Sequence, residues 1–107
     1  MFKAEEIADE ILIEVATVVR AIRGDAELAR QMRNATQSMS NNLGEGAGRF
    51  GKDRLLHYRY AYGSARELKR LLKFAVAFGH VRDTAIEHLR ELLDSELAIL
   101  WRLTHPK

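Results

Sequence analysis

A glycine-rich stretch, NNLGEGAGRFGK at residues 41–52, is the part of the chain most suggestive of phosphate chemistry. Four glycines fall within eight positions, and in a phosphate-binding loop such glycines let backbone N–H groups converge on the phosphate. The spacing does not fit, because Arg49 stands where a dinucleotide-binding pattern needs a glycine, and Asp53 where a P-loop needs Ser or Thr. We therefore interpret the stretch as the end of one helix and the turn into the next.

Metal-binding and nucleophilic side chains are scattered along the sequence. The four histidines are His57, His80, His88 and His105. Bundles that bind two metal ions use Glu-x-x-His pairs, and no Glu of this chain has a His three residues later. There is no cysteine, and Ser64 has no accompanying His–Asp pattern. We predict that the protein is not an enzyme and binds no metal or cofactor.

Positive charge is concentrated in one segment. Residues 51–79 hold seven Lys and Arg against two Asp and Glu, a net charge of +5, whereas the whole chain carries +2. Four of these cations recur every seven residues: Lys52, Arg59, Arg66 and Lys73. On a helix this spacing drifts only about 20° per repeat, so they form a continuous stripe, with Tyr62 on the same face and Lys69 and Arg70 beside it. Cations with an interleaved aromatic suit a phosphate backbone with stacked bases, so we predict that these seven residues, here called the basic surface, bind nucleic acid.

Two other interpretations of the basic surface stay open. Its cations can pair with acidic helices of the same chain or of a neighbouring subunit. The protein would then be a purely structural or protein–protein interaction module whose basic helix face forms subunit contacts. A basic amphipathic helix can also lie on an anionic membrane, although the apolar face of this helix is needed for the core.

Hydrophobic periodicity of helical type runs through the chain. Apolar residues recur at spacings of three and four, as at Ile7, Ile11 and Val15. This spacing predicts helices over residues 3–22, 26–47, 52–78 and 83–104. Because the breaks are short and strand patterns are lacking, we predict one domain over residues 1–107, an all-α, antiparallel up-down four-helix bundle.

Capping residues mark several of the predicted helix ends. Asp25 is a candidate N-cap of the second helix, and Gly79 is a candidate for the residue that follows the last turn of the third. Thr84 and Glu87 have the spacing of a capping box for the fourth helix.

The second predicted helix has an unusual polar face. Six of its polar positions are neutral rather than charged: Gln31, Asn34, Gln37, Ser38, Asn41 and Asn42. Either a neighbouring subunit covers this face, or it is a poorly optimised solvent-exposed face, and the sequence leaves both interpretations open.

The composition of the chain indicates where in the cell the protein is located. The chain has no cysteine, which fits a reducing environment, and its acidic N-terminal segment does not have the pattern of a signal peptide. No apolar run approaches the roughly 20 residues needed to cross a bilayer. We expect a cytoplasmic protein.

Three segments together resemble a known family: QMRNATQSMSNNLGEGAGR at residues 31–49, YAYGSARELKRLL at 60–72 and FGHV at 78–81. They are similar to segments of the bacterial four-helix-bundle proteins encoded by ribosomal-RNA intervening sequences, to which the accessory variability determinant of diversity-generating retroelements is related. The resemblance implies a homo-oligomeric ring, typically a pentamer, that lacks catalytic activity. For the retroelement relatives it further implies a basic surface that binds nucleic acid, and a reverse transcriptase as partner.

The motifs of that family fall on seven residues here: Asn42, Glu45, Gly46, Arg49, Gly63, Ser64 and Glu67. For these residues we expect structural roles. Gly63 is expected to let its helix approach a neighbour closely, since an unneeded mid-helix glycine costs about 1 kcal/mol. Glu45 and Glu67 are expected to bond across the interface between the second and third helices. Their candidate partners are Arg33, Arg49 and Ser64.

Two positions depart from the family pattern. Gly44 stands where alanine is usual, and Arg23-Gly24-Asp25 replaces a proline that is common between the first two helices. The second departure leaves the geometry of that turn open.

Overall fold

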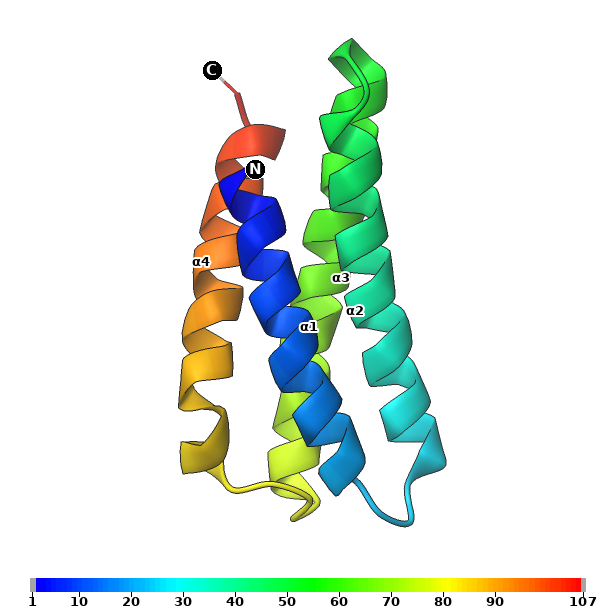
Figure 1. Ribbon diagram of the computed structural model, residues 1–107, viewed down its shortest axis with the longest axis vertical. Coiled ribbons are helices and arrows are strands. Elements are labelled where there is room, and N and C mark those ends of the chain that lie inside the picture. The colour runs from blue at the N-terminus through cyan, green and yellow to red at the C-terminus, as the bar shows by residue number, and fades with distance from the viewer. Residues whose placement is uncertain (1, 107) are drawn as a thin grey trace.

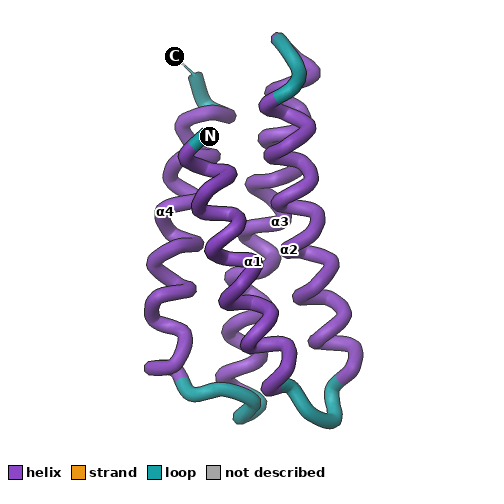
Figure 2. Tube along the Cα trace, viewed as in Figure 1, coloured by secondary structure: helices purple, strands orange, loops and turns teal. Residues whose placement is uncertain are grey.

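The computed structural model describes residues 2–106 and consists of helices joined by short turns (Figure 1). The helices are α1 (Lys3–Ala21), α2 (Ala26–Ala47), α3 (Gly51–Ala77), the short 3-10 helix η1 (Asp83–Ile86) and α4 (Glu87–Thr104). No strand occurs among the described residues, as the tube view also shows (Figure 2). Successive α-helices run in opposite directions, which confirms the predicted all-α bundle.

The helices form a closed ring of neighbours. α1 packs against α2 and α4, and α3 packs against the same two helices, with the most extensive contact between α2 and α3. In Figure 1 the α2–α3 hairpin rises beyond the ends of α1 and α4, where the two termini lie together. Within residues 2–106, no helix is long and apolar enough to cross a membrane.

The core consists largely of the predicted apolar faces. The α2 residues of this face are all buried: Leu28, Met32, Ala35, Met39 and Leu43. α3 also buries apolar residues at spacings of three and four: Ala61, Ala65, Leu68, Leu72 and Ala75. In α4 the pattern is less regular, because Leu97 and Leu103 are only half-buried while Glu96 is fully buried.

The turn between α1 and α2 is closed by a glycine and a cap. Gly24 has a φ of +73°, a left-handed conformation that L side chains rarely adopt. Asp25 then caps α2, because its Oδ1 accepts a hydrogen bond of 3.0 Å from the backbone N–H of Leu28. The Arg23-Gly24-Asp25 sequence thus builds the turn without a proline, and the predicted N-cap is confirmed.

The end of α3 has the predicted glycine. Gly79 has a φ of +79°, and its N–H donates to the carbonyl of Val76 at 3.0 Å. The N–H of His80 donates to the carbonyl of Ala75 at 2.9 Å. These two bonds make a Schellman motif, which satisfies carbonyls that the helix itself leaves without donors.

The predicted capping box at Thr84 and Glu87 is wrong. Residues 83–86 instead wind as η1, and neither η1 nor α4 has a side-chain hydrogen bond at its N-cap. The Asp83 carboxylate pairs with Arg90 of α4, so this junction is held by an ion pair that reaches across seven residues. The hydrogen bond from Arg90 lowers the pKa of Asp83.

Candidate nucleic-acid interface

The cations of the basic surface lie along one solvent-exposed side of α3. The side chains at the seven-residue spacing are all exposed: Lys52, Arg59, Arg66 and Lys73. The core residues of α3 lie on the opposite side of the helix, because they are offset by about half a turn from these positions. At about 1.5 Å per residue, the stripe from Lys52 to Lys73 is roughly 31 Å long.

Few of these cations are neutralised by their own chain. Lys69 Nζ lies 2.7 Å from Asp94 Oδ1 on α4, and this is the single ion pair of the basic surface among residues 2–106. Arg70 lies over the ring of Phe74, with 5.7 Å between its guanidinium carbon and the ring centroid. Pairing with the chain's own acidic helices therefore explains Lys69 but not the remaining cations.

Four members of the basic surface surround one hollow in the groove between α3 and α4. The hollow has a volume of about 280 Å³ and an apolar contribution from Leu97. Its cationic lining residues are Arg66, Lys69, Arg70 and Lys73. The structure does not bring Lys52 or Arg59 to this hollow, since Lys52 lies in the first turn of α3 and Arg59 lines a different groove toward α2.

Tyr62 lies on the flank of α3 that faces α4. It is half-buried against Trp101, with 6.0 Å between the ring centroids and 50° between the ring planes. Trp101 itself is 52% exposed. Sequence patterns alone do not single out Trp101, although it is the only tryptophan in the sequence and stands on the polar side of the helical pattern.

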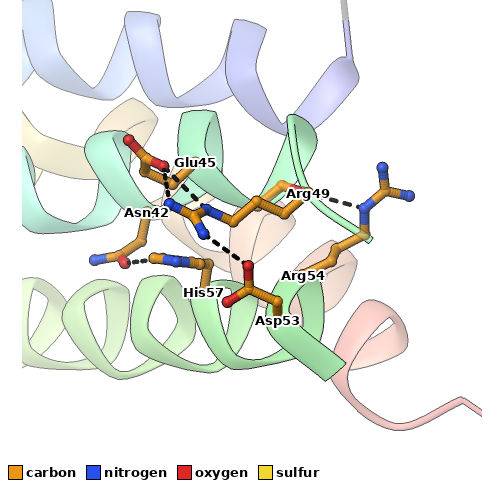
Figure 3. Close-up of polar contacts among 7 residues, drawn as sticks. Asn42, Glu45, Arg49, Asp53, Arg54 and His57 are labelled. Atoms are coloured by element: carbon orange, nitrogen blue, oxygen red, sulfur yellow. Dashed lines mark hydrogen bonds and ion pairs between the residues drawn. The ribbon is translucent and has the colours of Figure 1, made fainter. Parts of the chain in front are cut away.

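Several family-motif residues join α2 to α3 near the hairpin turn (Figure 3). Arg49 bonds to Glu45, one of the pairings expected from the sequence: its Nε donates to Glu45 Oε2 at 3.1 Å. Its Nη1 also donates to Asp53 Oδ2 at 2.7 Å. Glu45 belongs to α2 and Asp53 to α3, so Arg49 links the two helices. The hydrogen bond from Arg49 lowers the pKa of Asp53. All three side chains are largely exposed, so this bridge contributes little stability.

Arg54 makes a second connection that the sequence analysis missed. Its Nε donates to the carbonyl of Gly46 at 3.1 Å and its Nη2 to that of Ala47 at 3.3 Å (Figure 3). These carbonyls belong to the last turn of α2, which lacks intrahelical donors and carries partial negative charge. Arg54 therefore has a structural role and is not part of the basic surface.

A chain of polar contacts connects Asn42 and Ser64 across the same two helices. Ser64 Oγ donates to Ser38 Oγ at 2.7 Å, and Asn42 Nδ2 donates to the carbonyl of Ser38 at 2.9 Å. The Asn42 Oδ1 atom lies 2.9 Å from His57 Nδ1, which donates because the amide oxygen can only accept (Figure 3). These contacts use part of the neutral polar face of α2, whereas Asn34, Gln37 and Asn41 remain exposed.

Two expectations for the family motifs are wrong within this chain. Glu67 is exposed and has no hydrogen bond or ion pair among the described residues, because it lies on the solvent side of the α2–α3 groove. Gly63 meets no neighbour, since a Cβ placed on it would have no atom of another segment within 4 Å. Arg33 bonds to neither glutamate and instead lines a groove between α1 and α2.

Gly46 makes the close approach that was expected of Gly63. A Cβ on Gly46 would stand 2.6 Å from Cε1 and 2.7 Å from Cδ1 of Tyr58 on α3. Tyr58 cannot easily move away, because it is only 6% exposed and packs against Phe2.

We therefore expect Gly46→Ala to lower the free energy of unfolding by roughly 1–3 kcal/mol, as overpacked cores do. Gly44→Ala is the matched control, since Gly44 lies in the same helix with open space around it. The control should be neutral or stabilising by up to about 1 kcal/mol through helix propensity. Urea unfolding followed by circular dichroism measures both. Equal effects of the two substitutions would contradict the role assigned to Tyr58.

The fold and this surface define a class: an all-α four-helix bundle with a cationic outer face on its third helix. The chain matches the family model of the 23S rRNA-intervening sequence proteins over residues 2–102, so it belongs to that family. No curated protein was found to match it. The relation to the retroelement accessory proteins stays a prediction.

Proposed function

We propose that this protein is a cytoplasmic, non-enzymatic, oligomeric adaptor that associates with nucleic acid through the basic surface of α3. The observation that carries the proposal is the exposed row of cations on α3, of which Lys69 alone pairs with an acid of the described chain. Such a row of cations favours binding to a polyanion, because each cation that approaches a phosphate releases condensed counterions.

The choice of nucleic acid follows from the family. Its description connects these proteins with intervening sequences of 23S ribosomal RNA, so RNA is the first polyanion to test. Spacing supports a backbone contact: successive cations of the stripe lie about 10 Å apart along α3, so several phosphates of one strand can be contacted at once.

The oligomer is part of the same proposal. The resemblance to the retroelement accessory proteins suggests a homopentamer, and a reverse transcriptase as one partner to test. The exposed neutral side chains Asn34, Gln37 and Asn41 on the outer face of α2, and the open space around Gly63 in the α2–α3 groove, supply surfaces that a neighbouring subunit can cover.

A second candidate function uses the same cations differently. Exposed acids of α1, such as Glu6, Asp9 and Glu10, offer a neighbouring copy complementary charge. The basic surface would then form the subunit contact, and the protein would be a structural or protein-interaction module.

One experiment tests the proposal directly. Fluorescence anisotropy measures the binding of labelled single-stranded RNA and DNA of equal length by the wild-type protein at low salt, and light scattering reports its mass under the same conditions. Binding to nucleic acid by an oligomer supports the adaptor. An oligomer that binds neither strand at low salt overturns the adaptor in favour of the structural module.

A further inference from the structure

Trp101 stands at the mouth of the groove between α3 and α4 with about half of its surface exposed. Its exposed fraction is 52%, although two rings already contact it. The imidazole of His105 is stacked on the indole, with ring centroids 3.4 Å apart and planes inclined by 20°. Tyr62 packs at 6.0 Å from another side. An exposed tryptophan held between other rings is unusual in a small bundle, because burying it would stabilise the fold.

This aromatic group adjoins the cationic hollow. Trp101 lies one helical turn after Leu97, which lines the hollow, and Tyr62 lies one turn before Arg66, which also lines it. Because α3 and α4 are antiparallel, both steps lead in the same direction along the groove. Along the helix axis, the aromatic group therefore lies about one turn, roughly 5.4 Å, from Arg66 and farther from Lys69, Arg70 and Lys73.

Cations and an exposed aromatic ring recognise different parts of a nucleic acid. Cations alone bind any polyanion, whereas an aromatic ring beside them stacks on bases. Stacking on a protein ring requires unpaired bases, because the bases of a duplex already stack on one another. His105 already covers one face of the indole in parallel contact, so a base reaches that face by displacing the imidazole.

We propose that Trp101, supported by Tyr62, is a stacking platform for an unpaired base of a single strand whose phosphates lie on the cations of α3. This inference rests on the nucleic-acid function proposed above and adds to it a preference for single strands over duplexes.

The lone tryptophan makes the platform directly observable. Trp101 is the only tryptophan in the sequence, so intrinsic tryptophan fluorescence reports on this site alone. Single-stranded RNA should quench it on binding. Inorganic polyphosphate, which has the charge of the backbone but no bases, should bind without comparable quenching. A duplex of the same sequence should quench weakly.

Substitution separates stacking from charge. Trp101→Leu should weaken the binding of single-stranded RNA roughly 5- to 100-fold, the usual range for loss of one base–aromatic stack, and should leave the salt dependence unchanged. Trp101→Phe should restore most of the affinity. Ile13→Ala is the control, because Ile13 is 70% exposed on α1, which packs against α2 and α4 and lies diagonally opposite α3, and its loss should not affect binding.

The outcomes distinguish the two proposals. If Trp101→Leu binds single strands as tightly as the wild type, or if a duplex quenches as strongly as a single strand, the platform is overturned while the function of the basic surface stands. If the wild-type protein binds no RNA at low salt, both proposals fall.

Discussion

The free energy of unfolding should fall steadily as the pH rises from about 4.5 to about 8, because Glu96 is protonated in the folded protein. Its side chain is 0% exposed, and neither carboxyl oxygen has a hydrogen-bond partner among the described residues. Burial, which removes water from the carboxyl group, raises the pKa of Glu96 from 4.5 to about 8. The raised pKa is a statement about stability, since the unfolded chain ionises the same group at its ordinary pKa.

The sign follows from proton linkage. Between the two pKa values the folded protein holds a proton that the unfolded chain has released, so each added pH unit favours unfolding by about 1.4 kcal/mol. The contribution of Glu96 to stability is fully present below the unfolded pKa, decreases through this window and levels off above the folded pKa. Its total size is at most about 5 kcal/mol.

Glu96→Gln isolates this effect. The variant has a side chain of the same shape that does not ionise, so the difference between its pH profile and that of the wild type removes the contributions of all other groups. Urea unfolding at several pH values should show the slope in the wild type and lose it in the variant. Glu91→Gln, an exposed site on the same helix, should leave the profile unchanged. An unchanged slope in Glu96→Gln would show that the pKa of Glu96 is the same in the folded and unfolded protein, which contradicts this prediction.

Reversing two charges of the basic surface should weaken the binding of single-stranded RNA by roughly 100-fold or more. The variant is Arg59→Glu/Arg66→Glu, which replaces two exposed cations by anions at the centre of the stripe. A cation near a polyanionic surface contributes on the order of 1 kcal/mol, and each reversal adds repulsion to that loss. Both side chains are exposed, so the bundle itself should remain folded.

The matched control changes the net charge equally elsewhere. Arg20→Glu/Arg23→Glu places the same charges on exposed positions at the end of α1, which packs against α2 and α4 and lies diagonally opposite α3, and it should bind almost as tightly as the wild type. Anisotropy gives the affinities, and light scattering shows whether either variant loses its oligomeric state. An Arg59→Glu/Arg66→Glu variant that becomes monomeric would assign these arginines to a subunit interface. Equal losses in both variants would mean that only the net charge matters.

The fold was accessible from the sequence because its main determinants are local. Periodic apolar positions such as Met32 and Leu68 select one face of each helix, and that face is buried here. Asp25 and Gly79 mark helix ends because a side-chain cap and a left-handed glycine depend on neighbouring residues alone. The local pattern at Thr84 was misleading, because residues 83–86 wind as η1 and place the start of α4 after Thr84.

The site was less accessible because it depends on contacts between helices. The stripe could be predicted, since its residues share one helix. The hollow beside Leu97 and the contact of Tyr62 with Trp101 could not, because both need the register of α4 against α3. Similarly, the sequence around Glu96 predicts an exposed carboxylate, and only the packing of other helices against α4 buries it. Gly46 and Gly63 look alike in sequence, and Tyr58 alone distinguishes them.

The salt dependence of RNA binding shows whether the cations of α3 contact the nucleic-acid backbone. The logarithm of the association constant should fall linearly with the logarithm of the salt concentration, with a slope of about −0.7 for each phosphate contacted by a cation. For wild type, contacts from three or more cations predict a slope of about −2 or steeper. Neutralising two of them in Arg59→Gln/Arg66→Gln should make the slope shallower by about 1.4. A slope that is identical in the variant and the wild type would contradict the claim that these side chains contact the nucleic-acid backbone.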